Sequence, residues 1–130
     1  MGASQNADRI RKGYDAFNEG DVPALIDLFD EGIVWHFPGT SALAGAHVGR
    51  DATLGMLGGY GAAAAGTLKA NVVDVMASDD HVAGIAIDTA SANGKTLEVR
   101  ATVVFAMRDG KVTEAWHSFD DQAALDAFLA

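Results

Sequence analysis

The sequence predicts an α+β fold in which helices cover one face of a curved antiparallel sheet. Two observations predict it. In the first half of the 130-residue chain, apolar residues recur three and four positions apart, which is the spacing of one helical face. The second half contains four apolar runs of strand length, and the turn-forming pairs Asp79-Asp80, Asn93-Gly94 and Asp109-Gly110 separate them.

The first half predicts three helices around one short strand. Residues 7–18 carry the first apolar stripe. A second helix is expected from Asp21, whose carboxylate suits an N-cap, to Gly32. Residues 33–37 have the β-branched and aromatic composition of a short strand. A loop then leads to a third helix, which begins near Asp51 and contains several glycines that each cost it about 1 kcal/mol relative to alanine.

The second half predicts an antiparallel meander that ends in a short helix. The four strands are expected at residues 68–76, 82–90, 96–107 and 112–119. Asn93-Gly94 and Asp109-Gly110 are strong signals for tight hairpins between them. A last helical turn follows the capping residues at 120–122.

Composition narrows the possible partners and cofactors. A net charge of −9, with no run of Lys or Arg, argues against nucleic acid or an anionic membrane. The chain has no cysteine, which excludes disulfides and thiolate chemistry. It shows no apolar leader and no 18-residue apolar stretch, so we expect a cytoplasmic protein. We expect one domain over residues 1–130 and, because glycine-rich nucleotide motifs are lacking, no cofactor.

Several short motifs, taken in their order, are similar to one known family. They are Asn18-Glu19-Gly20-Asp21, Val34-Trp35-His36-Phe37-Pro38-Gly39, Leu43-Ala44-Gly45, Gly49-Arg50-Asp51, Asp109-Gly110-Lys111-Val112 and Trp116-His117. Over about residues 7–129 the chain resembles the SnoaL-like branch of the nuclear-transport-factor-2-like superfamily. The resemblance implies a cone-shaped sheet wrapped by three N-terminal helices, an internal apolar pocket, and homodimers that pair through the outer sheet face. Members of the superfamily include ketosteroid isomerases, polyketide cyclases, epoxide hydrolases and dehydratases.

His117 is the first candidate catalytic residue. Adjacent residues of a strand face opposite sides of the sheet, so Trp116 and His117 point in opposite directions. A plain two-residue turn at Asp109-Gly110 would set His117 opposite Thr102, whereas a bulge at Gly110 would set it opposite Ala101 on the apolar face. The resemblance favours the bulge, because the matching position in the ring cyclases carries a catalytic aspartate that faces the pocket. We expect His117 inside and Trp116 outside.

His36 is the second candidate. It matches the place where ketosteroid isomerases carry their proton-transferring aspartate, just before a similar proline-containing stretch. By that match Val34 and His36 point inward and Trp35 points outward. A slip of one residue would instead put Trp35 or Phe37 in the pocket.

Asp88 is the third candidate. A two-residue turn at Asn93-Gly94 pairs Asp88 with Val99, on the face expected for His117 and about 10 Å from it across two strand spacings. Burial there would raise the pKa of the Asp88 carboxyl. The alternative turns Ile85 and Ile87 inward and leaves Asp88 in solvent. His36, Asp88 and His117 could together form a three-ligand metal site, but their spacing is not that of a known ligand motif, so no metal is expected.

Eight further residues are expected to bind the ligand: Tyr14, Phe17, Trp35, Leu57, Tyr60, Val99, Val103 and Phe105. By the resemblance, Gly13 and Val103 occupy the positions of the two oxyanion donors of ketosteroid isomerases. Neither side chain can donate a hydrogen bond, so true steroid isomerase activity is disfavoured.

The function expected is cofactor-independent acid–base chemistry on a small, largely apolar polyketide- or terpenoid-like molecule. Cyclisation, isomerisation, dehydration and epoxide opening all belong to this class. The first alternative is a ligand-binding protein with the same pocket but no turnover, and the second is a dimerising module with a filled pocket. The residues expected on the dimerising face are Arg100, Thr102, Val104, Ala106 and Trp116.

Overall fold

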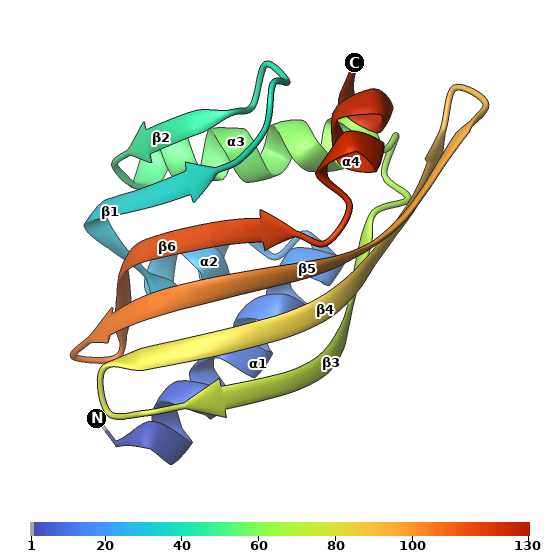
Figure 1. The fold of residues 1–130 in the computed structure, drawn as a ribbon. Helices are drawn as coiled ribbons and strands as arrows, with labels where there is room; N and C mark the ends of the chain where they lie inside the picture. The colour runs from blue at the N-terminus through green and yellow to red at the C-terminus, as the bar shows by residue number, and fades with distance from the viewer. Residues whose placement is uncertain (1) are drawn as a thin grey trace.

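One six-stranded sheet organises the computed structural model, which describes residues 2–130 (Figure 1). The strands are β1 (Phe29–Phe37), β2 (Gly45–Val48), β3 (Lys69–Ala77), β4 (His81–Ala92), β5 (Lys95–Arg108) and β6 (Lys111–Phe119), and they lie in the order β2-β1-β6-β5-β4-β3. The helices are α1 (Ala3–Glu19), α2 (Val22–Leu28), α3 (Arg50–Ala63) and α4 (Gln122–Leu129). The first three helices lie on one face of the curved sheet, which confirms the predicted α+β architecture (Figure 1).

The sheet is mixed rather than wholly antiparallel. Strand β1 runs parallel to β6, while every other neighbouring pair is antiparallel. The antiparallel prediction is wrong for this pair because β1 and β6 meet from distant parts of the chain, so no hairpin turn sets their direction. The segment expected as a loop before α3 also contributes a strand, since β2 pairs with the outer edge of β1.

The second helix is shorter than predicted. Asp21 caps it as expected, and its carboxylate accepts a hydrogen bond from the backbone N–H of Ala24 at 3.2 Å. The helix ends at Leu28, and the chain enters β1 at Phe29 instead of continuing helically to Gly32. Phe29 already pairs with Val112 of β6 and is buried, so joining the sheet places its ring in the core.

The turn between β5 and β6 differs from the predicted bulge. Asp109 and Gly110 have φ angles of 51° and 75°, and the residues on either side of them pair directly, as in a two-residue hairpin. The predicted bulge at Gly110 is therefore wrong. The extra residue is Thr113, which lies between the pairs Met107–Val112 and Ala106–Glu114.

This displaced bulge decides which way the last strand faces. It brings His117 opposite Val103 and Trp116 opposite Val104. Val103 is buried on the helix-covered face of the sheet, whereas Trp116 is 41% exposed. The predicted orientations, His117 inward and Trp116 outward, are confirmed, although a different irregularity in the strand produces them.

The β4–β5 hairpin follows the prediction. Its two-residue turn at Asn93-Gly94 pairs Asp88 with Val99. Asp88 is only 3% exposed, so it faces inward. Ile85 and Ile87 take the opposite face.

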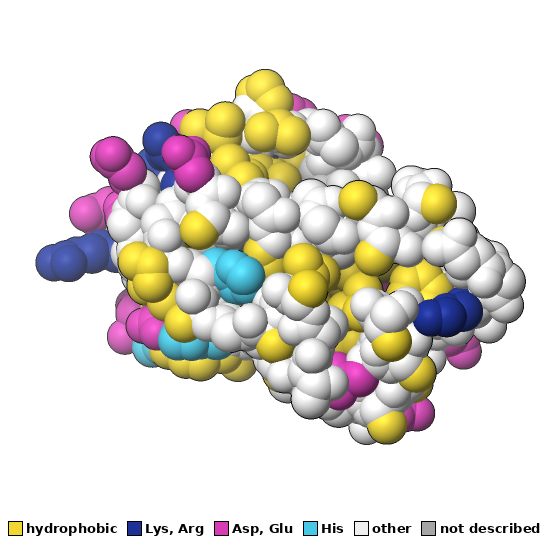
Figure 2. All heavy atoms as spheres, turned by 90° about the horizontal axis from the view of Figure 1, so that it is seen from above, with side chains coloured by type: hydrophobic (Ala, Val, Ile, Leu, Met, Phe, Trp, Pro, Cys, Tyr) yellow, Lys and Arg dark blue, Asp and Glu magenta, His cyan; other side chains and the backbone are white. Residues whose placement is uncertain are grey.

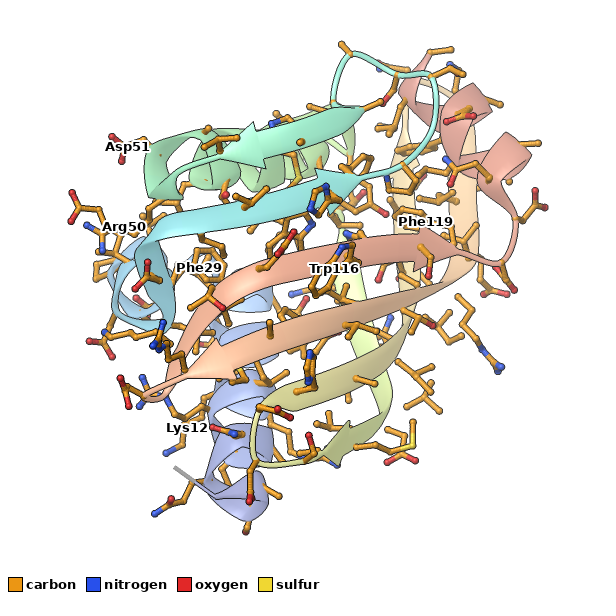
Figure 3. All side chains as sticks on the ribbon, turned by 60° about the vertical axis from the view of Figure 1, so that its left-hand side comes forward. Lys12, Phe29, Arg50, Asp51, Trp116 and Phe119 are labelled. Carbon is orange, nitrogen blue, oxygen red and sulfur yellow. The ribbon has the colours of Figure 1, made fainter. Side chains whose placement is uncertain are left out.

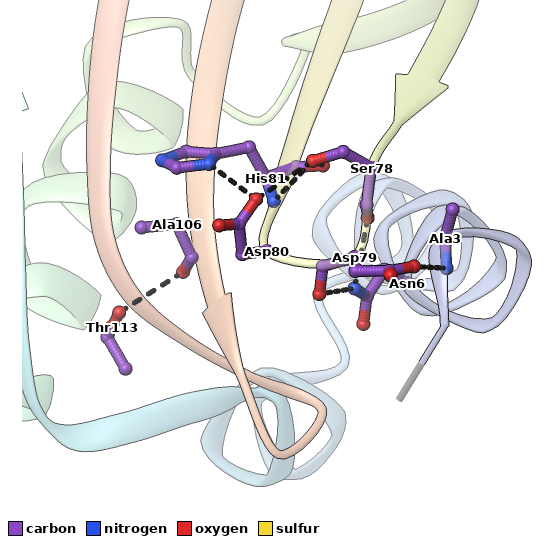
Figure 4. A network of polar contacts seen from close by, with 8 residues as sticks. All are labelled: Ala3, Asn6, Ser78, Asp79, Asp80, His81, Ala106 and Thr113. Atoms are coloured by element: carbon purple, nitrogen blue, oxygen red, sulfur yellow. Dashed lines mark hydrogen bonds and ion pairs between the residues drawn. The ribbon is translucent and has the colours of Figure 1, made fainter.

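The first helix is tied to the far edge of the sheet by the turn between β3 and β4. The Asn6 side-chain amide donates to the backbone oxygen of Asp79 at 3.0 Å, and the Ala3 N–H donates to the Asp79 carboxylate at 3.2 Å (Figure 4). Ile10, one turn further along α1, is buried against the sheet. These contacts hold α1 across the concave face, where its next turns cover the cavity described below.

Two further features concern the basic side chains on the surface and the length of the helices. On the face shown in Figure 2, the Lys and Arg side chains are scattered and do not gather into a patch. None of the helices within residues 2–130 has the length and apolarity needed to span a bilayer.

Candidate functional site

A cavity of about 60 Å³ lies between the concave face of the sheet and the helices α1, α2 and α3. Its walls are mostly apolar. Small side chains at Ala70, Ala86 and Ala101 leave the space, since all three lie on the inner face of neighbouring strands. The cavity is far smaller than the roughly 300–1,000 Å³ typical of a pocket that encloses a whole drug-sized ligand. It has room for a small chemical group.

Most of the predicted ligand-binding side chains line this cavity. They are Tyr14, Phe17, Trp35, Leu57, Tyr60, Val103 and Phe105. Val99 is buried on the same face but packs into the core instead. Sequence reasoning missed Ile10, Gly13, Leu25, Leu28 and Phe29, which complete the wall. Helical periodicity marks Ile10, Leu25 and Leu28 as core-facing, but it does not distinguish a cavity wall from solid core.

Asp88 is the buried acid of the site. One carboxylate oxygen, Oδ2, accepts a hydrogen bond from the Tyr60 hydroxyl at 2.9 Å. The other, Oδ1, is buried without a hydrogen-bond partner among residues 2–130. Burial raises the pKa of Asp88 to about 6, and the Tyr60 hydrogen bond partly offsets this rise. The carboxyl group therefore changes protonation close to neutral pH.

Two tyrosines of the helices, Tyr14 and Tyr60, lie close enough to Asp88 to respond to its charge. Burial and the negative charge of Asp88 raise the pKa of both Tyr14 and Tyr60, so both phenols stay protonated and can donate. The Tyr14 hydroxyl is buried and pairs with no other described atom. It lies against β4 at Gly84, where a Cβ would overlap the ring and its oxygen. Glycine at position 84 is what lets Tyr14 reach this depth.

His117 stands among aromatic rings. Its imidazole stacks on Phe119 at a centroid distance of 4.5 Å and meets the edges of Phe37 and Trp35 at 5.2 and 5.9 Å. Its Nδ1 is buried and has no partner in the described part of the chain. Burial lowers the pKa of His117 to about 3, so the ring is neutral near pH 7. A neutral imidazole can donate or accept a hydrogen bond, according to its tautomer.

Asp88 and His117 line the cavity from separated positions. On β5, their partners Val99 and Val103 are four residues apart, which is about 13 Å at the rise of an extended strand. The two side chains also project from strands on opposite sides of β5. They are thus offset along the strands as well as across them, unlike the simple lateral separation predicted. The cavity is therefore apolar with two separate polar side chains in its wall, Asp88 and His117.

His36 lies outside this cavity, so the predicted inward orientation is wrong. Its Nε2 lies 2.6 Å from a carboxylate oxygen of Glu114, and its ring stacks on Trp116 at 5.9 Å. Figure 3 shows Trp116 projecting from β6 on the face of the sheet opposite α1. The alternative slip of one residue is the one observed, because Trp35 and Phe37 turn inward and are buried. Burying two large aromatic rings removes more apolar surface from water than burying valine and histidine would.

The outward position of His36 also removes the three-ligand metal site considered above. Only Asp88 and His117 of that set reach the cavity. Within residues 2–130, no three His, Asp or Glu side chains come together in a way that could hold a metal ion.

Four of the residues that line the cavity carry a buried polar atom that has no hydrogen-bond partner among residues 2–130. Trp35 Nε1 and the Tyr14 hydroxyl can donate, Asp88 Oδ1 can accept, and His117 Nδ1 can do either. A buried polar group that lacks a partner costs about 1–3 kcal/mol, and such groups are few in folded proteins. Their concentration around one apolar cavity is typical of a site that binds a polar group of a ligand.

Comparison with known proteins agrees with the fold and the motifs. Residues 10–115 match the sequence profile of the SnoaL-like domain. An uncharacterised protein of Mycobacterium tuberculosis is 32% identical over 124 residues, which make up 95% of each chain. The structure of Bal32a, from a soil-derived mobile gene cassette, is 44% identical with a TM-score of 0.95 over 98% of both chains. The structure of IdmH from Streptomyces antibioticus, proposed to be a polyketide cyclase, is 27% identical with a TM-score of 0.77 over 96% of this chain and 98% of that one.

Proposed function

Because the chain belongs to the SnoaL-like domain family, we propose that it moves protons on a small carbonyl-bearing organic molecule held in the cavity. Asp88 is the acid–base group of this proposal. The likeness to IdmH supports a cyclisation. The proposal needs no metal and no bound cofactor.

The single observation that supports it most is the state of Asp88. A carboxyl group with a pKa of about 6 is a stronger base than an ordinary aspartate and still ionises near neutral pH. Its free oxygen, Oδ1, is buried at the cavity, while the Tyr60 hydroxyl holds the other oxygen in place. A base that is fixed in position and shielded from water suits the removal of a proton from carbon.

The chemistry follows from these positions. The ionised Asp88 carboxylate takes a proton from the carbon next to a carbonyl group, and the electron pair of the broken C–H bond moves onto the carbonyl oxygen. That oxygen then accepts a hydrogen bond from a neutral donor, and the candidate is the Tyr14 hydroxyl, which is buried without a partner among the described residues and lies near enough to Asp88 for its charge to raise the Tyr14 pKa. Return of the proton to another carbon isomerises the molecule. Attack of the enolate carbon on a second carbonyl carbon closes a ring, and the new alkoxide takes the proton back.

His117 has a different role in this proposal from Asp88. A group with a pKa of about 3 takes up little proton near pH 7, so His117 is a poor general base. Its neutral imidazole instead offers a hydrogen bond that orients the ligand. The surrounding rings of Phe37 and Phe119 fix the plane of the imidazole.

Deuterium exchange tests the proposal without knowledge of the natural substrate. Small ketones and β-diketones are incubated with the protein in D₂O, and mass spectrometry measures the uptake of deuterium next to the carbonyl. We expect exchange above the buffer rate, and we expect Asp88→Asn, which keeps the shape of the side chain, to abolish it. Glu114→Gln, on the outer face of the sheet, is the matched control and should leave exchange unchanged.

Two results would count against this proposal, the first against turnover and the second against Asp88 as the base. If ketones bind but no exchange exceeds the buffer rate, the protein is a binding protein without turnover. If Asp88→Asn exchanges as fast as the wild type, another group is the base.

A further inference from the structure

A second and larger cavity, of about 380 Å³, lies beside the first, where the end of α1 meets α2 and α3. We call it the vestibule and define it by the wall residues Val22, Leu54, Gly58 and Gly61. Val22 is 47% exposed and Gly58 is also exposed, so the vestibule reaches the protein surface. The inner cavity, by contrast, is bounded by the sheet.

The two cavities share part of their walls. Phe17, Leu25 and Leu57 line both of them. Leu25 and Leu57 are each only 7% exposed, and Phe17 is half-buried. These three apolar side chains therefore form the partition between the vestibule and the inner cavity. Of the three, Phe17 is the least buried, so rotation of its side chain is the smallest change that would join the two cavities.

Glycines in α3 keep the vestibule open. A Cβ built at Gly58 or Gly61 would meet no described atom within 4 Å, so a side chain at either position would fill free space. Each glycine costs the helix about 1 kcal/mol relative to alanine. The sequence thus gives up helix stability along the wall of this cavity.

Size and charge indicate what the vestibule holds. The inner cavity has room for a small group only, whereas the vestibule is within the range of ligand-sized pockets. Its wall is mainly apolar, and its one charged side chain, Glu19, disfavours an anionic occupant.

We propose that the vestibule binds the apolar, uncharged arm of an elongated ligand whose small carbonyl-bearing head enters the inner cavity between Phe17, Leu25 and Leu57. This inference rests on the proposed function, because it takes from there the carbonyl head. It adds the ligand class: a neutral molecule with a narrow polar end and an apolar arm, as opposed to a compact polycyclic molecule enclosed whole.

A homologous series of 2-alkanones, from acetone to 2-nonanone, tests both parts separately. Every member has the same head and differs only in the length of its arm. The chain has two tryptophans, so its ¹H–¹⁵N spectrum has two indole signals, and Trp116→Phe assigns the signal of Trp35. We expect every ketone to shift the Trp35 signal at saturation. We expect the dissociation constant to fall by up to about fourfold for each added methylene that enters the vestibule.

Filling the vestibule gives the decisive comparison. Gly58→Leu and Gly61→Leu should remove most of the gain in affinity with arm length while leaving acetone binding unchanged. Gly55→Leu is the matched control: it lies on the same helix, its Cβ also meets no described atom within 4 Å, and it lies outside the vestibule wall. It should keep the full gain. Leucine favours helix over glycine, so all three variants should fold.

The outcomes distinguish this inference from the proposed function. A Trp35 response to acetone with no gain along the series, or a gain that both vestibule variants retain, overturns the vestibule and leaves the proposed function standing. If no ketone of any length shifts the Trp35 signal, the ligand site itself is wrong, and this inference fails with it.

Discussion

The Tyr60 hydroxyl donates a hydrogen bond to Asp88 Oδ2 at 2.9 Å and so joins α3 to β4 across the cavity. Both side chains are buried. The bond occupies one carboxylate oxygen and leaves the other free, and it also lowers the pKa that burial has raised. The chemistry proposed for Asp88 therefore depends on a helix residue far from it in the sequence.

Tyr60→Phe should raise the pKa of Asp88 above about 6, because the substitution removes the hydrogen bond that favours the ionised form. Titration of the Asp88 carboxyl carbon by ¹³C NMR measures this directly. The pH at which deuterium exchange is half-maximal should rise by the same amount. A pKa that stays at its wild-type value would show that the bond does not tune the acid.

Asp88→Asn should stabilise the protein at pH 7 but not at pH 4. The folded-state pKa of Asp88, about 6, lies above its unfolded value of 3.8, so folding binds a proton between these values. The contribution of Asp88 to the free energy of unfolding is therefore largest below about pH 4 and is lost as the pH rises through 6. The difference of about two units between the folded and unfolded pKa of Asp88 corresponds to up to about 3 kcal/mol in the free energy of unfolding.

Urea unfolding of the wild type and Asp88→Asn across this pH range measures that effect. Asp15→Asn, at an exposed position of α1, controls for the substitution itself. Parallel stability curves for the wild type and Asp88→Asn would contradict a raised pKa at Asp88.

Gly84→Ala should destabilise the protein by about 1–3 kcal/mol, because the new methyl group would overlap the buried Tyr14 ring. Tyr14→Phe in the same chain should recover part of that loss, since it removes the atom closest to the methyl group. A double-mutant cycle in urea gives the coupling between the two positions. Additive effects would mean that Tyr14 does not press against β4.

We propose that two copies of the chain pair through the outer face of the sheet. Trp116 is 41% exposed there, beside Val104 on the neighbouring strand, and a large exposed aromatic ring favours a partner. Trp116→Glu should convert the dimer to a monomer in sedimentation velocity. Val48→Glu, which alters a 70% exposed residue on the edge strand β2, should leave the dimer intact. A wild-type monomer at micromolar concentration would contradict the proposal.

The α+β fold and the inward direction of Asp88 follow from sequence patterns. The pairing of Asp88 with Val99 was predictable because Asn93-Gly94 is a strong two-residue turn, and a turn determines the register of its hairpin. The bulge at Thr113 was not predictable, because a bulge inside a strand leaves no turn signature. The prediction placed the irregularity at Gly110 and reached the right face for the wrong reason.

The orientation of β1 shows a further limit. The inward prediction for Val34 and His36 comes from the resemblance to ketosteroid isomerases, whereas the apolar side chains of Ile33, Trp35 and Phe37 alternate with a set that contains the polar His36. Packing against the other aromatic rings decided it: Trp35 meets Phe29 and Phe105 edge-on. Such contacts come from distant parts of the chain and become visible only in the folded structure.

The parallel pairing of β1 with β6 has a consequence for the order of folding. The hairpins of β3 to β6 need only short loops, whereas joining β1 to β6 closes a loop of most of the chain, which costs entropy before any contact is gained. We expect the meander to form first and β1 to dock late, so that pulsed hydrogen exchange protects β4 and β5 before β1. Asp88 and His117 belong to the early half, and Tyr14, Trp35 and Tyr60 to the late half. The site would then be assembled only in the final step, when the two halves of the chain meet.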